Sequence, residues 1–503
     1  MNNSISAAPI GFQISKVSRD KRGTARLWFE GRRLLRAAFA VGAKVKKSFD
    51  ADKHTLTLEI AENGDTTISR KSRNGEDLPV LDIANKSVDE IFGRVERIKA
   101  TFYPGKIIIE IHPDEAAKAR RESRLLGKLK RNLCLSTASL SHGGGIMDAA
   151  AHKGLKISGV ETRLGFACEI EPEYLETSLR NNRVWADKDS KFYCGPMQDI
   201  RPADIGKEAD ILIAGLPCVD ASSAGRSKKK LKNAEAGKVG HLFHSFLNVV
   251  KWANPSIVQL ENVPEYQNTT SMAVIRACLQ EWGYTLHEQV LNGNDYGALE
   301  NRDRFFLVAV SSGLPNLLEG LSPISPKPAT LGEILETVPE DAPNWRTFDY
   351  LHKKEQRDKA AGKGFMMQIF AADSPRIATL RAGYHKGGST DPLLAHPNNP
   401  RLKRLLTPRE HAAVKGINPK LVEGCSNTLA HQILGQSVIS KVVEALYATI
   451  GLNLKKLVGH ETKKFNYPLQ KECEKKDSAA SVHRQKKSPQ TTLHSQMDLF
   501  ATQ

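Results

Sequence analysis

Residues 210–218 read Asp-Ile-Leu-Ile-Ala-Gly-Leu-Pro-Cys, an apolar run followed by a turn with glycine and proline that ends in cysteine. The β-branched run at 211–213 predicts a buried parallel strand. The turn then lies at the carboxyl end of that strand, the edge where open α/β sheets bind ligands. A lone cysteine is usually a small core residue, so a role for Cys218 as nucleophile depends on its neighbours.

Two later segments bring candidate neighbours to the same edge. Residues 256–260 are a second buried-strand run and end in Glu261-Asn262-Val263. Residues 304–310 form a third apolar run, preceded by Glu300-Asn301-Arg302-Asp303. We therefore expect Cys218, Glu261 and the arginines to converge.

A glycine-rich turn earlier in the chain is a candidate cofactor site. A predicted strand at 133–136 leads through Ser141-His142-Gly143-Gly144-Gly145 into a predicted helix at 146–151. Such glycines allow the backbone to approach a ligand closely. The strand at 166–170 carries Glu169, at the distance where an acid binds a ribose hydroxyl. Taken alone, an ordinary turn explains the glycines equally well.

The motifs Pro217-Cys218, Glu261-Asn262-Val263 and Arg302-x-Arg304, in this order, resemble those of DNA (cytosine-5)-methyltransferases of bacterial, plasmid or phage type. The resemblance covers about residues 133–451. It implies an α/β fold: a doubly wound, Rossmann-like sheet that binds S-adenosyl-L-methionine, with an inserted target-recognition region. An N-terminal β-rich domain precedes it.

The resemblance also implies the catalytic roles. Cys218 adds as thiolate to C6 of a flipped cytosine, Glu261 protonates or hydrogen-bonds N3, and C5 then accepts the methyl group. Arg304 holds the base O2, and Arg302 belongs to the same catalytic group.

Cofactor contacts are implied in the same way. Glu169 would bind the ribose and Asp199 the adenine amino group of S-adenosyl-L-methionine, without a metal ion. The further expected contacts are Gly143, Gly144, Gly145, Pro217, Gly435 and Ser437. The usual Asp-x-Phe-x-Gly-x-Gly pattern is absent, because a longer serine-rich segment at 136–142 replaces it, and Gln436 stands where the family has Asn.

The charge balance favours a polyanionic partner. The chain of 503 residues has a formal net charge of +17, and none of its apolar runs approaches the roughly 18 residues of a membrane span. We expect double-stranded DNA to be bound by the basic loop at 221–238, which is typical of a loop that closes over a backbone, and by the target-recognition region. The expected contacts are Ser222, Arg226, Lys228, Lys229 and Arg381.

The expected domains follow from changes in pattern. They are an N-terminal β-rich domain (1–115), a basic linker (116–132), the catalytic domain (133–312), the target-recognition region (313–400), the C-terminal catalytic part (401–452) and a disordered basic tail (453–503). The first domain faintly resembles AbrB-like DNA-binding domains, and an unspecific interaction or packing domain is the alternative. The basic helix at 118–131 is either an exposed connector lying along phosphates or a solvated helix.

The tail ends in a string that resembles the peptide bacterial proteins insert into the replicative sliding clamp: Gln496, Met497, Asp498, Leu499 and Phe500. The seven cysteines are scattered, without a C-x-x-C pair, and no signal peptide is recognisable. We therefore expect a reduced, cytoplasmic, nucleoid-associated protein.

Two rival functions stay open. A catalytically impaired DNA-binding relative is motivated by the altered cofactor loop, but the joint presence of Cys218, Glu261 and Arg304 argues against it. An RNA cytosine-5 methyltransferase is the second rival. The long insertion and the motif order favour DNA, whereas net charge cannot separate the two polymers.

Overall fold

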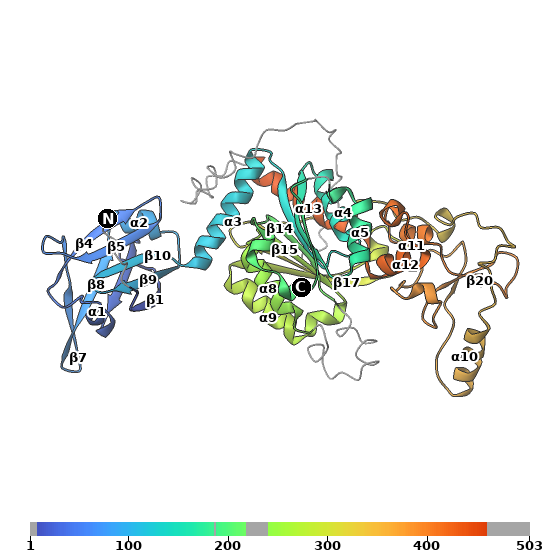
Figure 1. Ribbon diagram of the computed structural model, residues 1–503, viewed down its shortest axis with the longest axis horizontal. Coiled ribbons are helices and arrows are strands. Elements are labelled where there is room, and N and C mark those ends of the chain that lie inside the picture. The colour runs from blue at the N-terminus through green and yellow to red at the C-terminus, as the bar shows by residue number, and fades with distance from the viewer. Residues whose placement is uncertain (1–7, 186–187, 218–239, 460–503) are drawn as a thin grey trace. The chain divides into compact units, whose positions relative to one another are not determined.

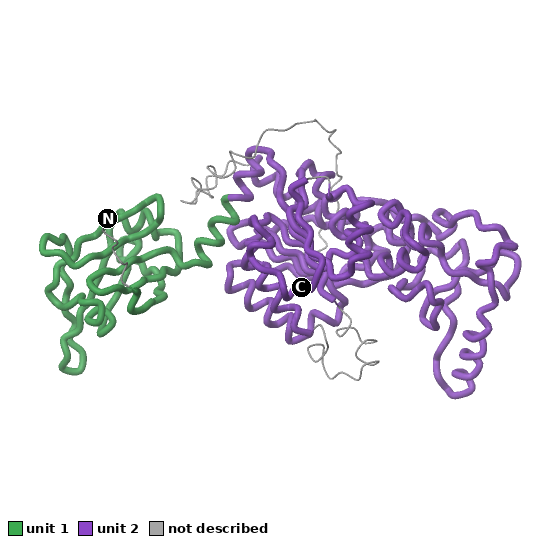
Figure 2. The backbone as a smooth tube through the Cα atoms, in the orientation of Figure 1, with its two compact units in different colours: residues 1–123, 466–480 green, residues 124–465, 481–503 purple. Residues whose placement is uncertain are grey.

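The computed structural model describes residues 8–185, 188–217 and 240–459. The described chain divides into two compact units between residues 123 and 124 (Figure 2). The division falls within helix α3 (Pro113–Lys130).

The first unit is built from two antiparallel sheets. One has the order β1 (Gly11–Lys16), β9 (Arg97–Tyr103), β10 (Lys106–Ile111), β5 (Thr55–Ile60), β4 (Lys44–Asp50) and β6 (Thr66–Thr67) (Figure 1). The other has the order β2 (Ser18–Arg19), β3 (Ala25–Glu30), β8 (Glu76–Ala84) and β7 (Ser69–Arg73), with helices α1 (Arg32–Arg36) and α2 (Lys86–Phe92). Alternating inward residues such as Leu27, Phe29, Leu56 and Leu58 form one core. The predicted β-rich N-terminal domain is confirmed.

A seven-stranded sheet forms the centre of the second unit. Its order is β13 (Lys191–Cys194), β12 (Thr162–Glu169), β11 (Leu135–Leu140), β14 (Ile211–Gly215), β15 (Ile257–Asn262), β17 (Asp303–Ser311) and β16 (Tyr284–Asn292). The first five strands pair in parallel. Strand β17 is antiparallel to both of its neighbours.

Separate apolar cores cover the two faces of this sheet. Ile211 and Ile213 of β14 pack with helices α4 (Ile146–Ile157) and α13 (Ser440–Gly459). Leu212 and Ala214 point the other way and pack with α8 (Leu242–Ala253) and α9 (Thr270–Glu281). Residues 211–214 are therefore all buried, which explains the continuous apolar sequence of this strand. The predicted doubly wound fold is confirmed.

Strand direction decides which residues share the carboxyl edge. Gly215 lies opposite Glu261 in the parallel pair β14–β15. Because β17 runs the opposite way, its first residues lie at the same edge, with Phe305 opposite Asn262. Arg304 therefore starts its strand where Glu261 ends another.

An insertion with little regular structure follows β17. It contains α10 (Asp349–Ala360) and a small sheet of β18 (Ile369–Phe370), β19 (Leu393–Ala395) and β20 (Lys403–Arg404). The chain then continues through α11 (Pro408–Val414) and α12 (Asn427–Gln436). Thr407 and Glu410 form a capping box that starts α11, as the Thr-Pro sequence predicts.

No single described helix is long and apolar enough to cross a membrane. Among the described helices, the pair α12 and α13, bent by 45°, reaches that length and composition, and most residues of α13 are buried within the unit.

The prediction that the basic helix is exposed is wrong for three of its cations, Arg121, Arg124 and Lys128. Arg124 and Lys128 of α3 are buried and both bind Asp210, at 2.9 Å from Arg124 Nε and 2.7 Å from Lys128 Nζ. The Asp210 carboxylate also accepts the backbone N–H of Ser136 at the start of β11. These charges therefore tie α3 to the central sheet instead of facing phosphates.

The first strand also differs from the prediction, because β11 extends to Leu140 through the serine-rich segment. Serine fits inside the sheet because its hydroxyl finds a partner: Ser139 is fully buried and donates to Asp148 at 2.8 Å.

Replacing Asp210 by Asn should destabilise the second unit by about 3–5 kcal/mol, because two buried cations lose their countercharge. Burial raises the pKa of Asp210, but Lys128 and Arg124 outweigh it and the pKa is lowered. The stabilisation is therefore present above the unfolded-state pKa, near ~4, and is lost as the pH falls through the folded-state pKa. Urea denaturation at several pH values tests this.

The exposed substitution Glu173→Gln serves as control and should change stability by less than about 0.5 kcal/mol. Equal urea midpoints for both variants at neutral pH would contradict the role of Asp210.

Candidate active site

An ion pair between Glu261 and Arg304 occupies the carboxyl edge of the sheet. Arg304 Nε lies 3.0 Å from Glu261 Oε1, and the two side chains retain only 16% and 13% exposure. A second guanidinium nitrogen of Arg304 donates to the carbonyl of Asp303 at 2.6 Å, which restricts the side chain. The pair is thus held in place yet still reachable from solvent.

The pKa of Glu261 is raised. Burial is the main cause, and the positive charges of Arg304, Arg302 and Lys415 oppose it. A carboxyl group in such surroundings can hold a proton closer to neutral pH than an exposed glutamate and can deliver it to a bound ligand.

Asn262 connects this pair with the segment that precedes Cys218. Its side-chain amide is 1% exposed and donates to the carbonyl of Leu216 at 3.2 Å, and its Oδ1 accepts from the N–H of Val263. Pro217, half-buried, follows directly. The sequence interpretation gave Asn262 no role of its own. Its position directly after Glu261 at the end of a predicted buried strand could have indicated that it is a buried polar contact.

Several predicted residues of this edge lie outside the described residues. They are Cys218, Ser222, Arg226, Lys228 and Lys229.

Arg302 lies deeper than Arg304 and joins three segments. It is 4% exposed and donates to the carbonyls of Leu380 and Gly435, each at 3.2 Å. It also pairs with Glu300 at 3.4 Å. These contacts hold Arg302 at the junction of the three segments, whereas Arg304 forms the ion pair with Glu261.

A second buried pair supports the same junction. Lys415 and Glu300 are both fully buried, with Nζ and Oε2 2.7 Å apart. Burial and the charge of Arg302 lower the pKa of Lys415 to about 7. Glu300 Oε1 accepts the backbone N–H of Leu380, so the pair anchors the insertion to the start of β17.

Glycine is favoured for different structural reasons at the three positions of the predicted cofactor loop. Gly143 has φ +58°, and a Cβ built on it would meet no atom within 4 Å, so it borders open space. A Cβ on Gly144 would come within 2.6 Å of Ile433, and one on Gly145 within 2.5 Å of Ser178. Close packing of the protein itself therefore requires glycine at these two positions.

Glu169 is preorganised beside this open space. Its carboxylate accepts the N–H of Gly143 at 2.5 Å and the N–H groups of Ile170 and Glu171, each at 3.0 Å. The neighbouring Ile170 is 58% exposed, an apolar surface next to the carboxylate that the sequence interpretation missed. A carboxylate held in this way can still accept a hydrogen bond from a ligand hydroxyl through its remaining lone pairs.

A buried polar cluster holds the loop where the usual family pattern is missing. His142 Nδ1 lies 2.9 Å from Asp148 Oδ2, and its Nε2 lies 2.8 Å from the hydroxyl of Ser178. Sequence reasoning also missed these residues, because nothing local marks Asp148 and Ser178 as partners of one histidine.

The remaining predicted residues are dispersed. Asp199 is exposed at the end of a short 3-10 helix, Met197–Asp199. Gly435 is pressed against the backbone of Arg381, since a Cβ would come within 2.2 Å of it. Ser437 caps α12 and donates to the carbonyl of Leu434. Arg381 is half exposed and binds Asp391 through two guanidinium nitrogens.

Among the residues that the structure describes, no three His, Cys, Asp or Glu side chains form a group that could hold a metal ion.

Comparison with known proteins gives consistent matches over the second unit. The family model for C-5 cytosine-specific DNA methylase matches residues 136–452. Type II methyltransferase M.NlaX of Neisseria lactamica is 32% identical over 299 residues, covering 57% of this chain and 88% of that protein. Type II methyltransferase M.SsoII of Shigella sonnei is 30% identical over 305 residues, which cover 57% of this chain and 76% of that protein. The crystal structure of S. pombe Dnmt2 methyltransferase matches with a TM-score of 0.49 and 17% identity. The match covers 63% of this chain and 98% of that one.

Removing the charge of Arg304 should raise the pKa of Glu261 further, because the first of the opposing cations is lost. An isotope-edited infrared titration of the carboxyl group tests this in Arg304→Ala, with Glu261→Gln used to assign the band. Arg304→Lys keeps the charge and should shift the titration less. An unchanged titration in Arg304→Ala would show that the ion pair does not control this carboxyl group.

Proposed function

Because this chain belongs to the family of C-5 cytosine-specific DNA methylases and is a DNA cytosine-5 methyltransferase, we propose that Cys218 is its nucleophile and that Glu261 and Arg304 hold the target cytosine. The observation that carries this assignment is the Glu261–Arg304 pair at the strand edge shared with Pro217.

Catalysis begins with addition to the base, because C5 of cytosine is a poor nucleophile. Sγ of Cys218 bonds to C6, the π electrons move toward N3, and Glu261 delivers a proton to N3. C5 is then enamine-like and accepts a methyl group. A water molecule takes the C5 proton, the electron pair reforms the C5–C6 double bond and expels the cysteine sulfur as thiolate, and N3 returns its proton to Glu261.

The ion pair suits both halves of this cycle. The raised pKa of Glu261 favours the protonated carboxyl group, which can then deliver its proton to N3. Arg304 limits that rise and offers guanidinium donors for the base O2. Since none of these groups reaches a stacked base, the target cytosine is flipped out of the duplex.

S-adenosyl-L-methionine is the methyl donor of this family, and the described loop fits it. Glu169 would bind the ribose hydroxyls, and the open space at Gly143 leaves room for the cofactor beside that carboxylate. Asp199 would reach the adenine amino group. When bound, the cofactor supplies an electrophilic methyl group.

We assign target recognition to residues 313–400. Arg381 supports this, because Asp391 holds its half-exposed guanidinium in one orientation and leaves donors for a nucleic acid. The basic loop would close over the backbone. The named relatives are Type II methyltransferases, which favours a role in restriction–modification. The impaired-relative hypothesis is weakened by the retained Glu261–Arg304 pair.

The finer cellular setting rests on sequence alone. A cytoplasmic enzyme on nucleoid DNA is consistent with its substrate. The sliding-clamp peptide at residues 496–500 lies outside the described residues and stays a prediction from its sequence.

Replacing Cys218 by Ala should abolish methyl transfer and leave DNA binding nearly unchanged, because the thiol is required for covalent addition and not for phosphate contacts. Duplex DNA with 5-fluorocytosine at the target should form a denaturation-resistant adduct with the native chain and none with Cys218→Ala. The buried Cys168 gives the matched control Cys168→Ala, which should retain the adduct. Undiminished methylation by Cys218→Ala would refute the assignment.

Glu169→Ala should weaken S-adenosyl-L-methionine binding by roughly 1–3 kcal/mol, since buried partners lose their acceptor. Calorimetry with the exposed control Glu173→Gln measures this effect. Binding that is equally tight in both variants would place the cofactor elsewhere.

A further inference from the structure

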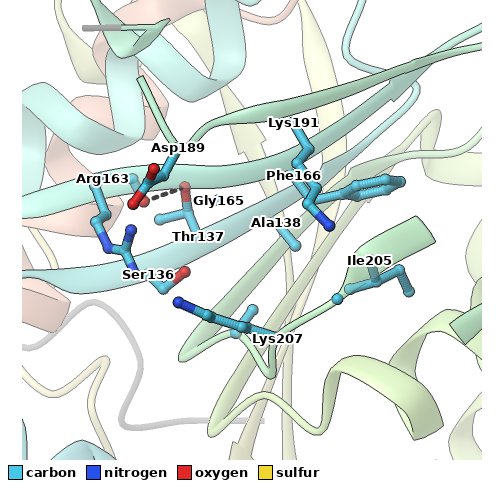
Figure 3. A pocket seen from close by; sticks show the side chains of 12 residues that line it. Ser136, Thr137, Ala138, Arg163, Gly165, Phe166, Asp189, Lys191, Ile205 and Lys207 are labelled. Carbon is cyan, nitrogen blue, oxygen red and sulfur yellow. Dashed lines mark hydrogen bonds between the residues drawn. The ribbon is translucent and has the colours of Figure 1, made fainter. Parts of the chain in front are cut away.

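A second hollow lies at the opposite edge of the central sheet. It is a cavity of about 350 Å³ between the starts of β11, β12 and β13 and the segment that leads into β14 (Figure 3). Glu169 and Glu261 end their strands at the carboxyl edge, so this cavity is separate from the catalytic site. Its volume lies within the range of small-molecule sites.

Basic side chains outnumber acidic ones in its lining. Arg163, Lys191 and Lys207 contribute positive charge, against a single carboxylate from Asp189 (Figure 3). Within the described residues, the ammonium groups of Lys191 and Lys207 make no hydrogen bond or ion pair with the protein. Their charge is therefore available to a bound anion.

A serine hydroxyl faces the same space. Ser136 is only 7% exposed, and its hydroxyl has no hydrogen-bond partner among the described residues, although it lines the cavity. A hydroxyl at the cavity wall that is not used by the protein can donate to or accept from a ligand in that space.

Two glycines keep room for these groups. A Cβ on Gly165 would approach Ser136 Oγ to 2.7 Å, and one on Gly206 would approach Lys191 Nζ to 2.6 Å. Gly206 also has φ +79°, which disfavours any side chain there. Both substitutions would push a polar group out of its position at the cavity.

We propose that this cavity binds the phosphate group of a small nucleotide. Lys191, Lys207 and the Ser136 hydroxyl would hold the phosphate oxygens through charge-assisted hydrogen bonds. Phe166 and Ile205 line the cavity with apolar surface, which suits the sugar or base of such a ligand.

Calorimetry on the full-length chain tests the proposal with AMP, after saturation of the methyl-donor site with S-adenosylhomocysteine. The native chain should bind AMP saturably at 150 mM salt and bind adenosine at least tenfold more weakly. The double variant Lys191→Gln/Lys207→Gln should lose about tenfold or more in AMP affinity, because two charged donors are removed. Ser136→Ala should lose several-fold.

A matched control removes two exposed lysines outside the cavity, Lys156→Gln/Lys420→Gln, and should bind AMP as the native chain does. Both double variants should retain native thermal midpoints. Absence of saturable AMP binding to the native chain, equal affinities of the two double variants, or adenosine binding as tightly as AMP would each overturn the proposal.

Discussion

The antiparallel direction of β17 is the constraint on which the rest of the site depends. Glu261 ends β15 at the carboxyl edge, and Arg304 starts β17 at the same edge because the two strands run in opposite directions. A parallel β17 would place its first residues roughly 20 Å away, the length of a six-residue strand. The ion pair that opposes the effect of burial on the pKa of Glu261 therefore follows from topology.

The same strand end also carries the insertion. Arg302 reaches the carbonyls of Leu380 and Gly435, and Glu300 joins Lys415 to the backbone of residue 380. Asn262 holds the carbonyl of Leu216 just before Cys218. Buried polar contacts thus fix both the segment that precedes Cys218 and the proposed recognition region close to the ends of β15 and β17.

Local patterns predicted the residues that end or begin strands, such as Glu169, Glu261 and Arg304. Apolar periodicity does not report strand direction, so the reason for the convergence came only from the structure. The basic residues of α3 were misinterpreted because their partner, Asp210, is more than eighty residues away in sequence. Glycine content likewise could not separate Gly143, which borders open space, from Gly145, which packing requires.

The most direct test of the central claim is a crystal structure of the chain covalently trapped on duplex DNA that contains 5-fluorocytosine. We predict a bond from Cys218 Sγ to C6, with N3 within hydrogen-bond distance of Glu261 and O2 within reach of Arg304. An ordered adduct through another residue, or a trapped base with N3 facing away from Glu261, would contradict the account.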